Sequence, residues 1–496
     1  MKHSTLIGAA ALAIACSAQA QKSTADGIAE YRKMLEDGNP AELYEAKGEN
    51  LWKTARGPKN ATLEKCDLGK GPGVVNGVFV ELPRYFADTK MVQDLESRLV
   101  TCMATLQGFD AAEIVKTPFG RGEQANVTAL ATWVASLSRG MRFNLPQSHP
   151  EEQRSYELGK RAFFYRAGPY DFACATCHGS PDKRIRLQDL PDLTHNPGDG
   201  IGFAAWPAYR VSNGQMWSMQ LRLNDCFRQQ RFPAPIFGSE ATIALSTYMG
   251  VNAKGAKSIA PAIKRGGAPP PPPARLHGEP DMNSLRPILV LTAAAAALAG
   301  CADGPSQAEL DAQSAQMMKT SFHAQGIATM SRLDQDEMQK ACSSEHPPSA
   351  AVEKRIMETA QASIEWPADG NFFGDWRKGD KLAQSGRGMS WTDKSAAPAN
   401  NGGSCYNCHQ LDQKELSYGT IGPSLLHYGK LRGVTDPRAA SASEVVKYTW
   451  GRLWNAKATV PCSSMPRFGH EKILDAAQLR DLMSLLLDPQ SPVNAQ

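Results

Sequence analysis

Two copies of the pattern C-x-x-C-H constrain this chain more than any other feature. They read Cys-Ala-Thr-Cys-His at 174–178 and Cys-Tyr-Asn-Cys-His at 405–409. Two thiols on one helical turn can add to the two vinyl groups of a haem, and the adjacent histidine becomes the fifth iron ligand. A zinc knuckle is the alternative, but neither half offers a second Cys/His pair at zinc spacing. We therefore expect two covalently bound haem c groups. The residues concerned are Cys174, Cys177 and His178, and Cys405, Cys408 and His409.

Length and composition bound the rest. A chain of 496 residues is too long for one hydrophobic core, so more than one domain is expected. Hydrophobic residues make up 42% and charged residues 21%, which is an ordinary balance for a globular protein. The net charge of +4 favours neither nucleic acid nor a polybasic membrane patch.

The N-terminus has the layout of a secretory signal peptide. Lys2 precedes an apolar run over 6–15, and Ala-Gln-Ala at 18–20 is a small-x-small cleavage site. We expect cleavage after Ala20, which removes Cys16, and a mature protein in the periplasm.

A second signal-like segment lies in the middle of the chain. A proline run at 269–273 predicts a stiff linker over 263–281. A methionine, a positive charge, a 14-residue apolar core over 287–300 and a lipoprotein-like box ending in Cys301 follow, over 282–301. The core is short for a membrane span, which needs about 20 residues. Either a natural fusion retains a remnant signal or two adjacent genes were joined, and the intact pattern favours the second. Processing would leave a lipid anchor at Cys301.

The second half has the features of a small, mainly α-helical electron carrier. Pro423 is placed to offer its carbonyl to the proximal imidazole of His409. Met465 follows 56 residues after His409 and is the expected sixth ligand, since a thioether opposite histidine raises the reduction potential. His427 and His470 are rival ligands. Apolar residues at helical spacing predict a C-terminal helix over 476–487, packed against the haem-bearing helix.

The first half places a cysteine where a sixth ligand is expected. Cys226 lies 48 residues after His178, and Arg222 lies one helical turn before it. A cation beside a thiol stabilises the thiolate, which is both a ligand and a nucleophile. Ser212-Asn213 can cap a helix that begins near Gln215. The residue chemistry leaves other ligands open, and these are Met216, Met219 and Met249.

Eleven cysteines leave an odd number outside the motifs. Five remain when the haem motifs, Cys16 and Cys301 are set aside: Cys66, Cys102, Cys226, Cys342 and Cys462. An odd count in an oxidising compartment suggests one unpaired thiol with a function. Cys66 with Cys102 and Cys342 with Cys462 fall within single domains, but five cysteines permit other pairings.

The chain resembles the two subunits of the SoxAX cytochrome complex of bacterial thiosulfate oxidation, joined as SoxA (about 21–262) and SoxX (about 302–496). The Arg-x-x-x-Cys element at 222–226 is the most discriminating part of this resemblance, and Met-Pro-Arg-Phe-Gly at 465–469 supports the SoxX half. The resemblance implies that His178 and Cys226 ligate the first haem, that Arg222 and Cys226 are catalytic, and that Cys226 carries a persulfide in some states.

One departure concerns the N-terminal repeat, which carries a further haem in some SoxA proteins. Here residues 63–69 hold Cys66 without a second cysteine or a histidine. The resemblance implies that Cys66 and Cys102 close a disulfide in place of that haem. The expected fold is therefore mainly α, with two or three cytochrome c-like domains: a haem-less domain at 21–145, a SoxA-like domain at 146–262 and a class I cytochrome c domain of SoxX type at 302–496.

The resemblance also implies an activity. The enzyme would join thiosulfate oxidatively to a cysteine of a SoxYZ-type sulfur-carrier protein and pass electrons to an acceptor cytochrome c, as an L-cysteine S-thiosulfotransferase. The rival interpretation is a non-catalytic dihaem electron-transfer cytochrome, with Met or His as sixth ligand of the first haem and Cys226 structural. A dihaem peroxidase, which needs an open iron site, is a third possibility.

Overall fold

The computed structural model describes residues 30, 34, 38–186, 188–195, 201–264 and 305–495. The chain divides into two compact units, Met1–Pro40 and Ala41–Gln496, and the second contains both attachment motifs. The signal peptide expected at 1–20, the proline run and the lipoprotein-like segment at 282–301 lie outside the described residues.

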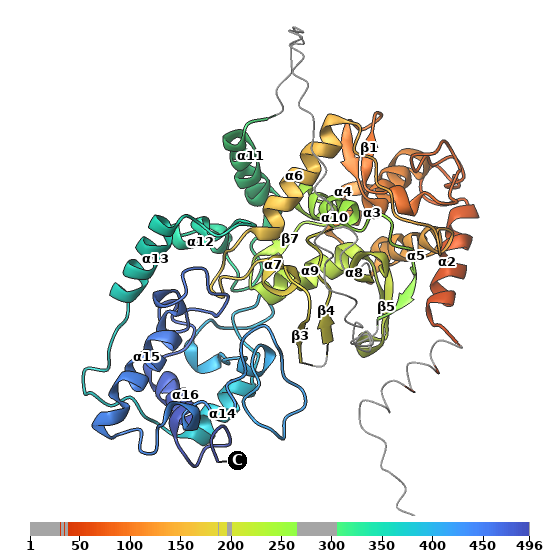
Figure 1. Cartoon of the computed structure of the whole chain (residues 1–496). Helices are drawn as coiled ribbons and strands as arrows, with labels where there is room; N and C mark the ends of the chain where they lie inside the picture. The colour runs from red at the N-terminus through yellow and green to blue at the C-terminus, as the bar shows by residue number, and fades with distance from the viewer. Residues whose placement is uncertain are drawn as a thin grey trace, which may run out of the picture. The chain divides into compact units, whose positions relative to one another are not determined.

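The second unit is mainly helical, as predicted (Figure 1). Its α-helices are α2 (Ala41–Lys53), α3 (Leu95–Cys102), α4 (Ala111–Lys116), α5 (Gly122–Ser136), α6 (Pro150–Phe164), α7 (Cys174–His178), α8 (Ile201–Ala204), α9 (Met219–Gln230), α10 (Glu240–Asn252), α11 (Gln307–Thr320), α12 (Glu337–Ala341), α13 (Ala350–Ala362), α14 (Trp376–Gln384), α15 (Ser443–Trp454) and α16 (Ala476–Leu487).

The strands of the described residues are short, so they join neighbouring loops rather than form a sheet core. They are β1 (Arg84–Phe86) with β2 (Met91–Gln93), β3 (Lys183–Ile185) with β4 (Gln188–Leu190), β5 (Ala208–Arg210) between β6 (Gln215–Trp217) and β8 (Ala262–Ile263), and β7 (Ala234–Pro235) with β9 (Phe322–His323). The β5–β8 pair is parallel and the other pairs are antiparallel.

Three helix pairs repeat one packing arrangement along the chain. In each pair an earlier helix crosses a later one: α2 crosses α5, α6 crosses α10, and α14 crosses α16. A glycine lies at each crossing, at Gly48, Gly159 and Gly379. A Cβ there would collide with a backbone carbonyl of the later helix, that of Ala129, Ala244 or Asp481 respectively. Only glycine lets the two backbones approach so closely, so the three helix pairs share the same close crossing.

The C-terminal helix has the predicted bounds, but its neighbour differs from the one expected. Asp475 caps α16 by accepting from the backbone N–H of Gln478, whose side chain in turn accepts from the N–H of Asp475. The second attachment motif is a 3-10 turn over Cys405–Asn407 rather than an α-helix. Ser404 before it has a left-handed φ of 55° and Cys408 after it has a φ of −117°, so the turn is not extended on either side. The expected packing of α16 on a haem-bearing helix is therefore wrong, and α16 packs on α14 and α15 instead.

The hydrophobic core does not follow the predicted domain ranges throughout. One cluster joins side chains of the first half with Leu310, Met317, Phe322 and Leu333, which were expected in the second cytochrome domain. A separate cluster fills the second half from Ile364 to Val493.

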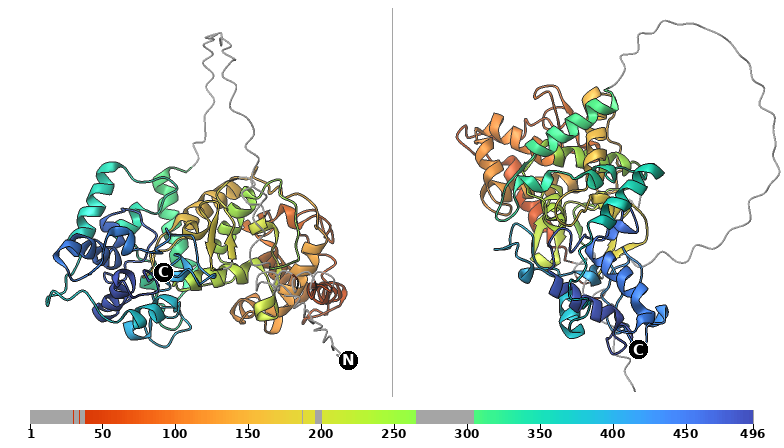
Figure 2. Two further views of the ribbon diagram at one scale, coloured as in Figure 1. Left: turned by 60° about the horizontal axis from the view of Figure 1, so that its bottom comes forward. Right: turned by 90° about the vertical axis from the view of Figure 1, so that its left-hand side faces the viewer.

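Helix α11 lies against α6, as Figures 1 and 2 show with α11 in green and α6 in yellow. Arg161 on α6 pairs with Asp311 at 2.9 Å, and β7 pairs with β9. Residues 310–333, which follow the linker in the chain, therefore complete the core of the first half.

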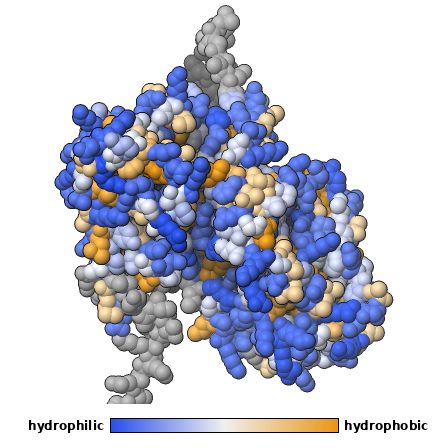
Figure 3. All heavy atoms as spheres, turned by 180° about the vertical axis from the view of Figure 1, so that it is seen from behind, coloured by the Kyte–Doolittle hydropathy of each residue, from blue (hydrophilic) through white to orange (hydrophobic). Residues whose placement is uncertain are grey.

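The face drawn in Figure 3 is mostly hydrophilic, with apolar residues scattered in small groups. No helix within the described ranges combines the length and apolar character needed to cross a membrane.

Candidate functional site

The first attachment motif forms the single-turn helix α7. The hydroxyl of Thr176 accepts from the backbone N–H of Ala173 at 3.0 Å and so closes the start of the turn. Cys174 and Cys177 are not disulfide-bonded, although the chain forms disulfides elsewhere. Both thiols are therefore available for thioether bonds.

His178 is oriented as an iron ligand requires. Its Nδ1 lies 2.8 Å from the carbonyl oxygen of Pro191, so Nδ1 carries the proton and Nε2 keeps a free lone pair. Burial lowers the pKa of His178 to about 4, which keeps the ring neutral. Sequence reasoning did not find Pro191. The signal was present, because this proline lies 13 residues after its histidine and Pro423 lies 14 after His409.

Cys226 and Arg222 both lie on α9, as predicted, but the helix begins later than expected. Residues Gln215–Trp217 form β6, which pairs with β5 after a turn at Gly214, where φ is 62°. The predicted start near Gln215 with a cap at Ser212-Asn213 is therefore wrong. The cap is Ser218, whose side chain accepts from the N–H of Leu221.

Cys226 lies near the two thiols of α7. Burial first, and then the neighbouring Cys226, raise the pKa of Cys174 to about 12 and that of Cys177 to about 11. The side chain of Gln230, at the end of α9, donates to the sulfur of Cys174 at 3.7 Å. Helix α9 thus presents Cys226 to the motif that carries His178.

Three arginines gather on Asp225, the residue before Cys226. Asp225 accepts from Arg210 at 3.1 Å, Arg222 at 3.1 Å and Arg228 at 2.8 Å. Burial alone would raise the pKa of Asp225, but the hydrogen bond from Arg228 and the charges of these arginines outweigh burial and lower it. One carboxylate shared by three guanidinium groups leaves net positive charge at this face, which suits an anionic substrate.

Lys264 belongs to the same region and was missed by sequence reasoning. Burial, together with the charges of Arg222 and Arg210, lowers its pKa to about 7. Its Nζ donates to the side chain of Gln188 at 3.2 Å. Asp225 was also missed, although its place three residues from both Arg222 and Arg228 was a signal for helical ion pairs.

The second motif repeats the histidine arrangement. Nδ1 of His409 lies 2.6 Å from the carbonyl oxygen of Pro423, which confirms the predicted acceptor. A Cβ on Gly422 would collide with the ring of His409, so a glycine is needed for the backbone to lie against the imidazole. Cys405 and Cys408 are also not disulfide-bonded.

Met465 lies on a loop that packs, with Cys405 and Leu425, against the core of the second half. Its backbone N–H donates to the hydroxyl of Ser463 at 3.2 Å, and the adjacent Cys462 is disulfide-bonded to Cys342. No described contact joins Met465 to His409, so its ligand role stays a prediction. His427, with a buried Nδ1 that has no hydrogen-bond partner among the described atoms, and His470, whose pKa burial lowers, stay rivals.

The methionines that compete with Cys226 have other packing roles. Met216 is buried in β6 and Met249 is buried in α10, while Met219 begins α9 beside the Trp206 cluster. No described contact joins any of the three to His178, and they stay alternatives.

The two attachment motifs lie close together. Arg186, which follows β3, donates to the side chain of Asn407 at 2.7 Å, inside the second motif. Burial first, and then the nearby Cys177, raise the pKa of Cys408 to about 12. Cys177 of the first motif and Cys408 of the second motif thus lie near each other.

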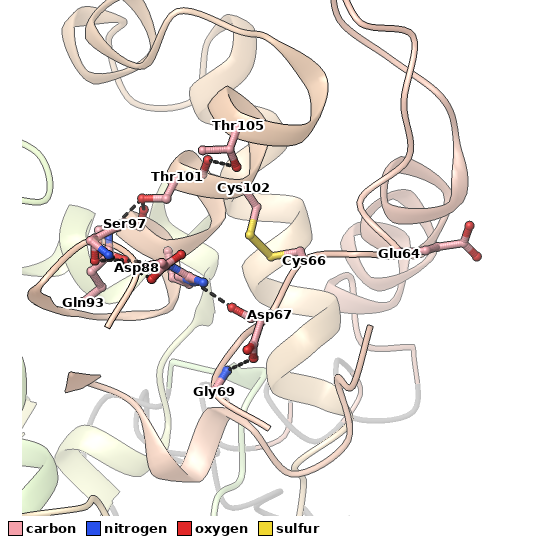
Figure 4. The surroundings of a disulfide bond; sticks show 12 residues. Glu64, Cys66, Asp67, Gly69, Asp88, Gln93, Ser97, Thr101, Cys102 and Thr105 are labelled. Carbon is pink, nitrogen blue, oxygen red and sulfur yellow. Dashed lines mark hydrogen bonds and ion pairs between the residues drawn. A yellow bond between two sulfur atoms is a disulfide. The ribbon is translucent and has the colours of Figure 1, made fainter. Parts of the chain in front are cut away.

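The disulfide between Cys66 and Cys102 that the resemblance implied is confirmed, and the structure also pairs Cys342 with Cys462, a pairing that the sequence left open. Cys66 bonds to Cys102, with Cα atoms 5.6 Å apart, and Cys342 bonds to Cys462, with Cα atoms 5.4 Å apart. Figure 4 shows the first of them, where Cys66 reaches the end of α3. The side chain of Arg98 donates to the carbonyl of Asp67 at 2.7 Å and holds this turn in place. Cys66 and Cys102 are therefore both used in a covalent link.

The residues present fit a haem c at each C-x-x-C-H motif. Each motif offers two unpaired thiols and a histidine whose Nδ1 is committed to a proline carbonyl. This donor set is the one that covalent haem attachment requires.

Comparison with known proteins indicates the class of protein from a segment that precedes both attachment motifs. Residues 47–143 match the family model described as SoxA/TsdA, cytochrome c domain. The chain thus contains a domain similar to the cytochrome c domain of the SoxA/TsdA family.

The relatives are more specific. The SoxA subunit of L-cysteine S-thiosulfotransferase from Hydrogenophilus thermoluteolus is 55% identical over 238 residues, which cover 48% of this chain and 87% of that protein. A SoxA subunit from Hydrogenobacter thermophilus is 33% identical over 227 residues, covering 46% and 82%. The crystal structure of SoxXA from P. pantotrophus matches at 23% identity with a TM-score of 0.39, covering 46% of this chain and 81% of that one. The chain belongs to the SoxA family of L-cysteine S-thiosulfotransferase subunits, which confirms the predicted enzyme class.

Proposed function

We propose that this chain is a two-haem thiosulfotransferase that holds SoxA-like and SoxX-like halves in one polypeptide. The observation that carries the proposal is the placement of Cys226, with Arg222 one turn away on α9, against the thiols of the motif that contains His178. A plain electron carrier needs no cysteine beside positively charged side chains at this point.

The proposed reaction joins thiosulfate to a cysteine thiol of a sulfur-carrier protein of the SoxYZ type. A sulfur–sulfur bond forms between the carrier sulfur and the outer sulfur of thiosulfate, the thiol proton is released, and two electrons leave. An acceptor cytochrome c takes these electrons one at a time. The haem groups, when bound, supply one-electron redox steps.

The residues of the chain have separate parts in this scheme. The cationic face formed by Arg210, Arg222 and Arg228 binds and orients the thiosulfate dianion. Cys226, as a thiolate or as a persulfide, supplies the sulfur that reacts with thiosulfate. When bound, the iron of the first haem would be held by His178 and Cys226, and that of the second haem by His409 and Met465.

Three cytochrome c-like domains fit the same proposal. The crossings at Gly48, Gly159 and Gly379 support one such domain each, the first with a disulfide where the others have attachment cysteines. The P. pantotrophus protein is named SoxXA, and the proposal assigns the corresponding pair of subunits to the two halves of this chain. Export to the periplasm, from the signal pattern at 1–20, and a lipid anchor at Cys301 in a processed protein complete the proposal.

A Cys226→Met variant tests the proposal. A thioether can still bind iron, so both haems should be retained, but loss of thiolate donation should raise the potential of the first haem. Thiosulfate-dependent reduction of the acceptor cytochrome, measured with the carrier present, should fall to near background. Electron paramagnetic resonance of the oxidised protein should lose its thiolate-ligated low-spin signal.

An Arg222→Ala variant is the matched comparison. It keeps the sulfur and should keep the resonance signal, but it should turn over more slowly because the anion is held less well. A Cys226→Met protein with unchanged resonance and unchanged turnover would instead favour the non-catalytic dihaem cytochrome.

A further inference from the structure

A buried charge cluster joins the two halves of the chain. Asp171, which is fully buried, pairs with Arg166 of its own half at 3.3 Å and with Lys457 of the second half at 2.7 Å. Lys457 is also fully buried. Buried charges are costly unless they are paired, so this cluster holds its members in one arrangement.

Arg166 does more than balance Asp171. Its Nη1 donates to the carbonyl of Cys462 at 2.9 Å, and its Nη2 donates to the carbonyl of Ser463 at 2.6 Å. One guanidinium therefore spans a carboxylate of the first half and two consecutive carbonyls of the second, a geometry that its fork of donors permits.

The segment that Arg166 holds is the loop that leads to Met465. The hydroxyl of Ser463 accepts from the N–H of Met465, two residues on. On its far side the loop is held by Arg467, which is fully buried and pairs with Asp336 and Glu471, each at 2.7 Å. Arg166 thus anchors this loop of the second half from the first half.

We propose that Arg166 is a positioning residue for Met465, so that the SoxA-like half sets how firmly the thioether is held at the second haem. The inference rests on the proposed function in taking Met465 as the sixth ligand. It goes further in assigning part of that ligation to a residue outside the cytochrome domain that contains it.

Loss of the guanidinium should make Met465 easier to displace. Hydrogen bonds from a charged donor stabilise the held loop. Their loss should raise the equilibrium constant for release of the loop by about ten- to a hundredfold. In the full-length ferric holoprotein, cyanide should then replace the thioether faster in Arg166→Gln than in the unsubstituted protein. The readout is the decay of the weak red absorption band of a thioether–ferric haem bond, and Met465→Ala, which should lack the band, assigns it.

Arg231→Gln is the matched control. Arg231 is as buried as Arg166 and also donates across the two halves, to the carbonyls of Gly388 and Gly386, but it does not touch the loop at 460–467. It should leave the cyanide rate close to that of the unsubstituted protein. Arg166→Lys keeps a positive charge beside Asp171 but lacks the forked donors of the guanidinium. It should therefore fold even if Arg166→Gln does not, and cyanide replacement should be accelerated less than in Arg166→Gln.

Equal acceleration in the Arg166 and Arg231 variants would overturn the proposal, because the effect would then come from general loosening of the two halves. Unchanged rates in both Arg166 variants would overturn it as well. If Met465→Ala kept the band, the ligand assignment of the proposed function would fall, and this inference with it.

Discussion

At the scale of single residues, the close contact of Gly422 with the ring of His409 gives a direct prediction. Gly422→Ala adds a methyl group where the imidazole lies, so the ring must tilt or move. We expect an altered absorption spectrum and a shifted potential for the second haem. Pro423→Ala should change little, because the acceptor of the His409 proton is a backbone carbonyl that alanine retains. Matching spectra for both variants would show that the ring position does not depend on Gly422.

A second residue-scale prediction concerns Glu96. Burial, and then the neighbouring Asp94, raise the pKa of Glu96 from 4.5 to about 8. The folded state therefore keeps a proton that the unfolded chain releases, so the stability is fully present below about pH 4.5 and is lost as the pH rises through about 8. Glu96→Gln should flatten this fall in the free energy of unfolding, measured by denaturant titration at several pH values. The same change at exposed Glu113 should leave the fall in place.

The residue scale is also where the sequence was most informative. The attachment motifs and the carbonyl of Pro423 were predictable because each depends on a short spacing, and the Cys66–Cys102 disulfide was implied by the family resemblance. The pairing of Cys342 with Cys462 stayed open, since five cysteines permit several pairings. The contacts of Arg166 were not, since its carbonyl acceptors lie 296 and 297 residues away and no local pattern marks such a pair.

At the scale of elements, the two disulfides should differ in their effects. Loop entropy gives about 4 kcal/mol for the 36-residue separation of Cys66 and Cys102, and about 5 kcal/mol for the 120-residue separation of Cys342 and Cys462. Replacing either pair by alanine should lower the unfolding midpoint. Replacing Cys342 and Cys462 should in addition weaken the thioether band, because Cys462 anchors the loop of Met465. A weakened thioether band in the Cys66/Cys102 variant would contradict the expectation that only the Cys342–Cys462 disulfide affects Met465.

Element boundaries were predicted unevenly. Helix α16 begins and ends where its periodicity indicated, since strong capping and a long apolar face agree. The start of α9 was placed too early, because residues 215–217 satisfy their backbone groups by pairing with 208–210, a partner that lies earlier in the chain and leaves no helical signal. The 3-10 turn at the second motif was missed because its residue pattern does not distinguish Cys405–Asn407 from a turn of α-helix.

At the scale of the whole molecule, the structure predicts that the two halves associate without their linker. Apolar side chains of α11 are buried in the core of the first half, β7 pairs with β9, and Arg161 pairs with Asp311. Residues 21–264 and 302–496 produced as separate chains should therefore elute together in gel filtration, both with haem. A second chain that lacks residues 305–333 should bind more weakly. Separate elution of the longer pair would show that the covalent connection is required.

This part of the architecture was beyond sequence reasoning. The predicted boundary at 302 followed a signal-like pattern, whereas the packing of 310–333 with the first half depends on which apolar surfaces meet in space. Periodicity shows that a helix has an apolar face, but it does not identify the surface that covers it.

The cysteine inventory has a consequence for how the protein is made. Among the described residues, four cysteines are oxidised in pairs and five are not, and both kinds occur in one chain. Covalent haem attachment needs reduced thiols, whereas the two disulfides need an oxidant. During assembly four of these nine cysteines must therefore be oxidised while the other five stay reduced. Cys66 and Cys102 are the first of these nine in the chain, so in a protein exported as proposed they would emerge, and could pair, before the C-x-x-C-H segments follow. A premature bridge between Cys174 and Cys177 would block cofactor attachment, so the yield of mature protein should depend on a thiol-reducing step during assembly.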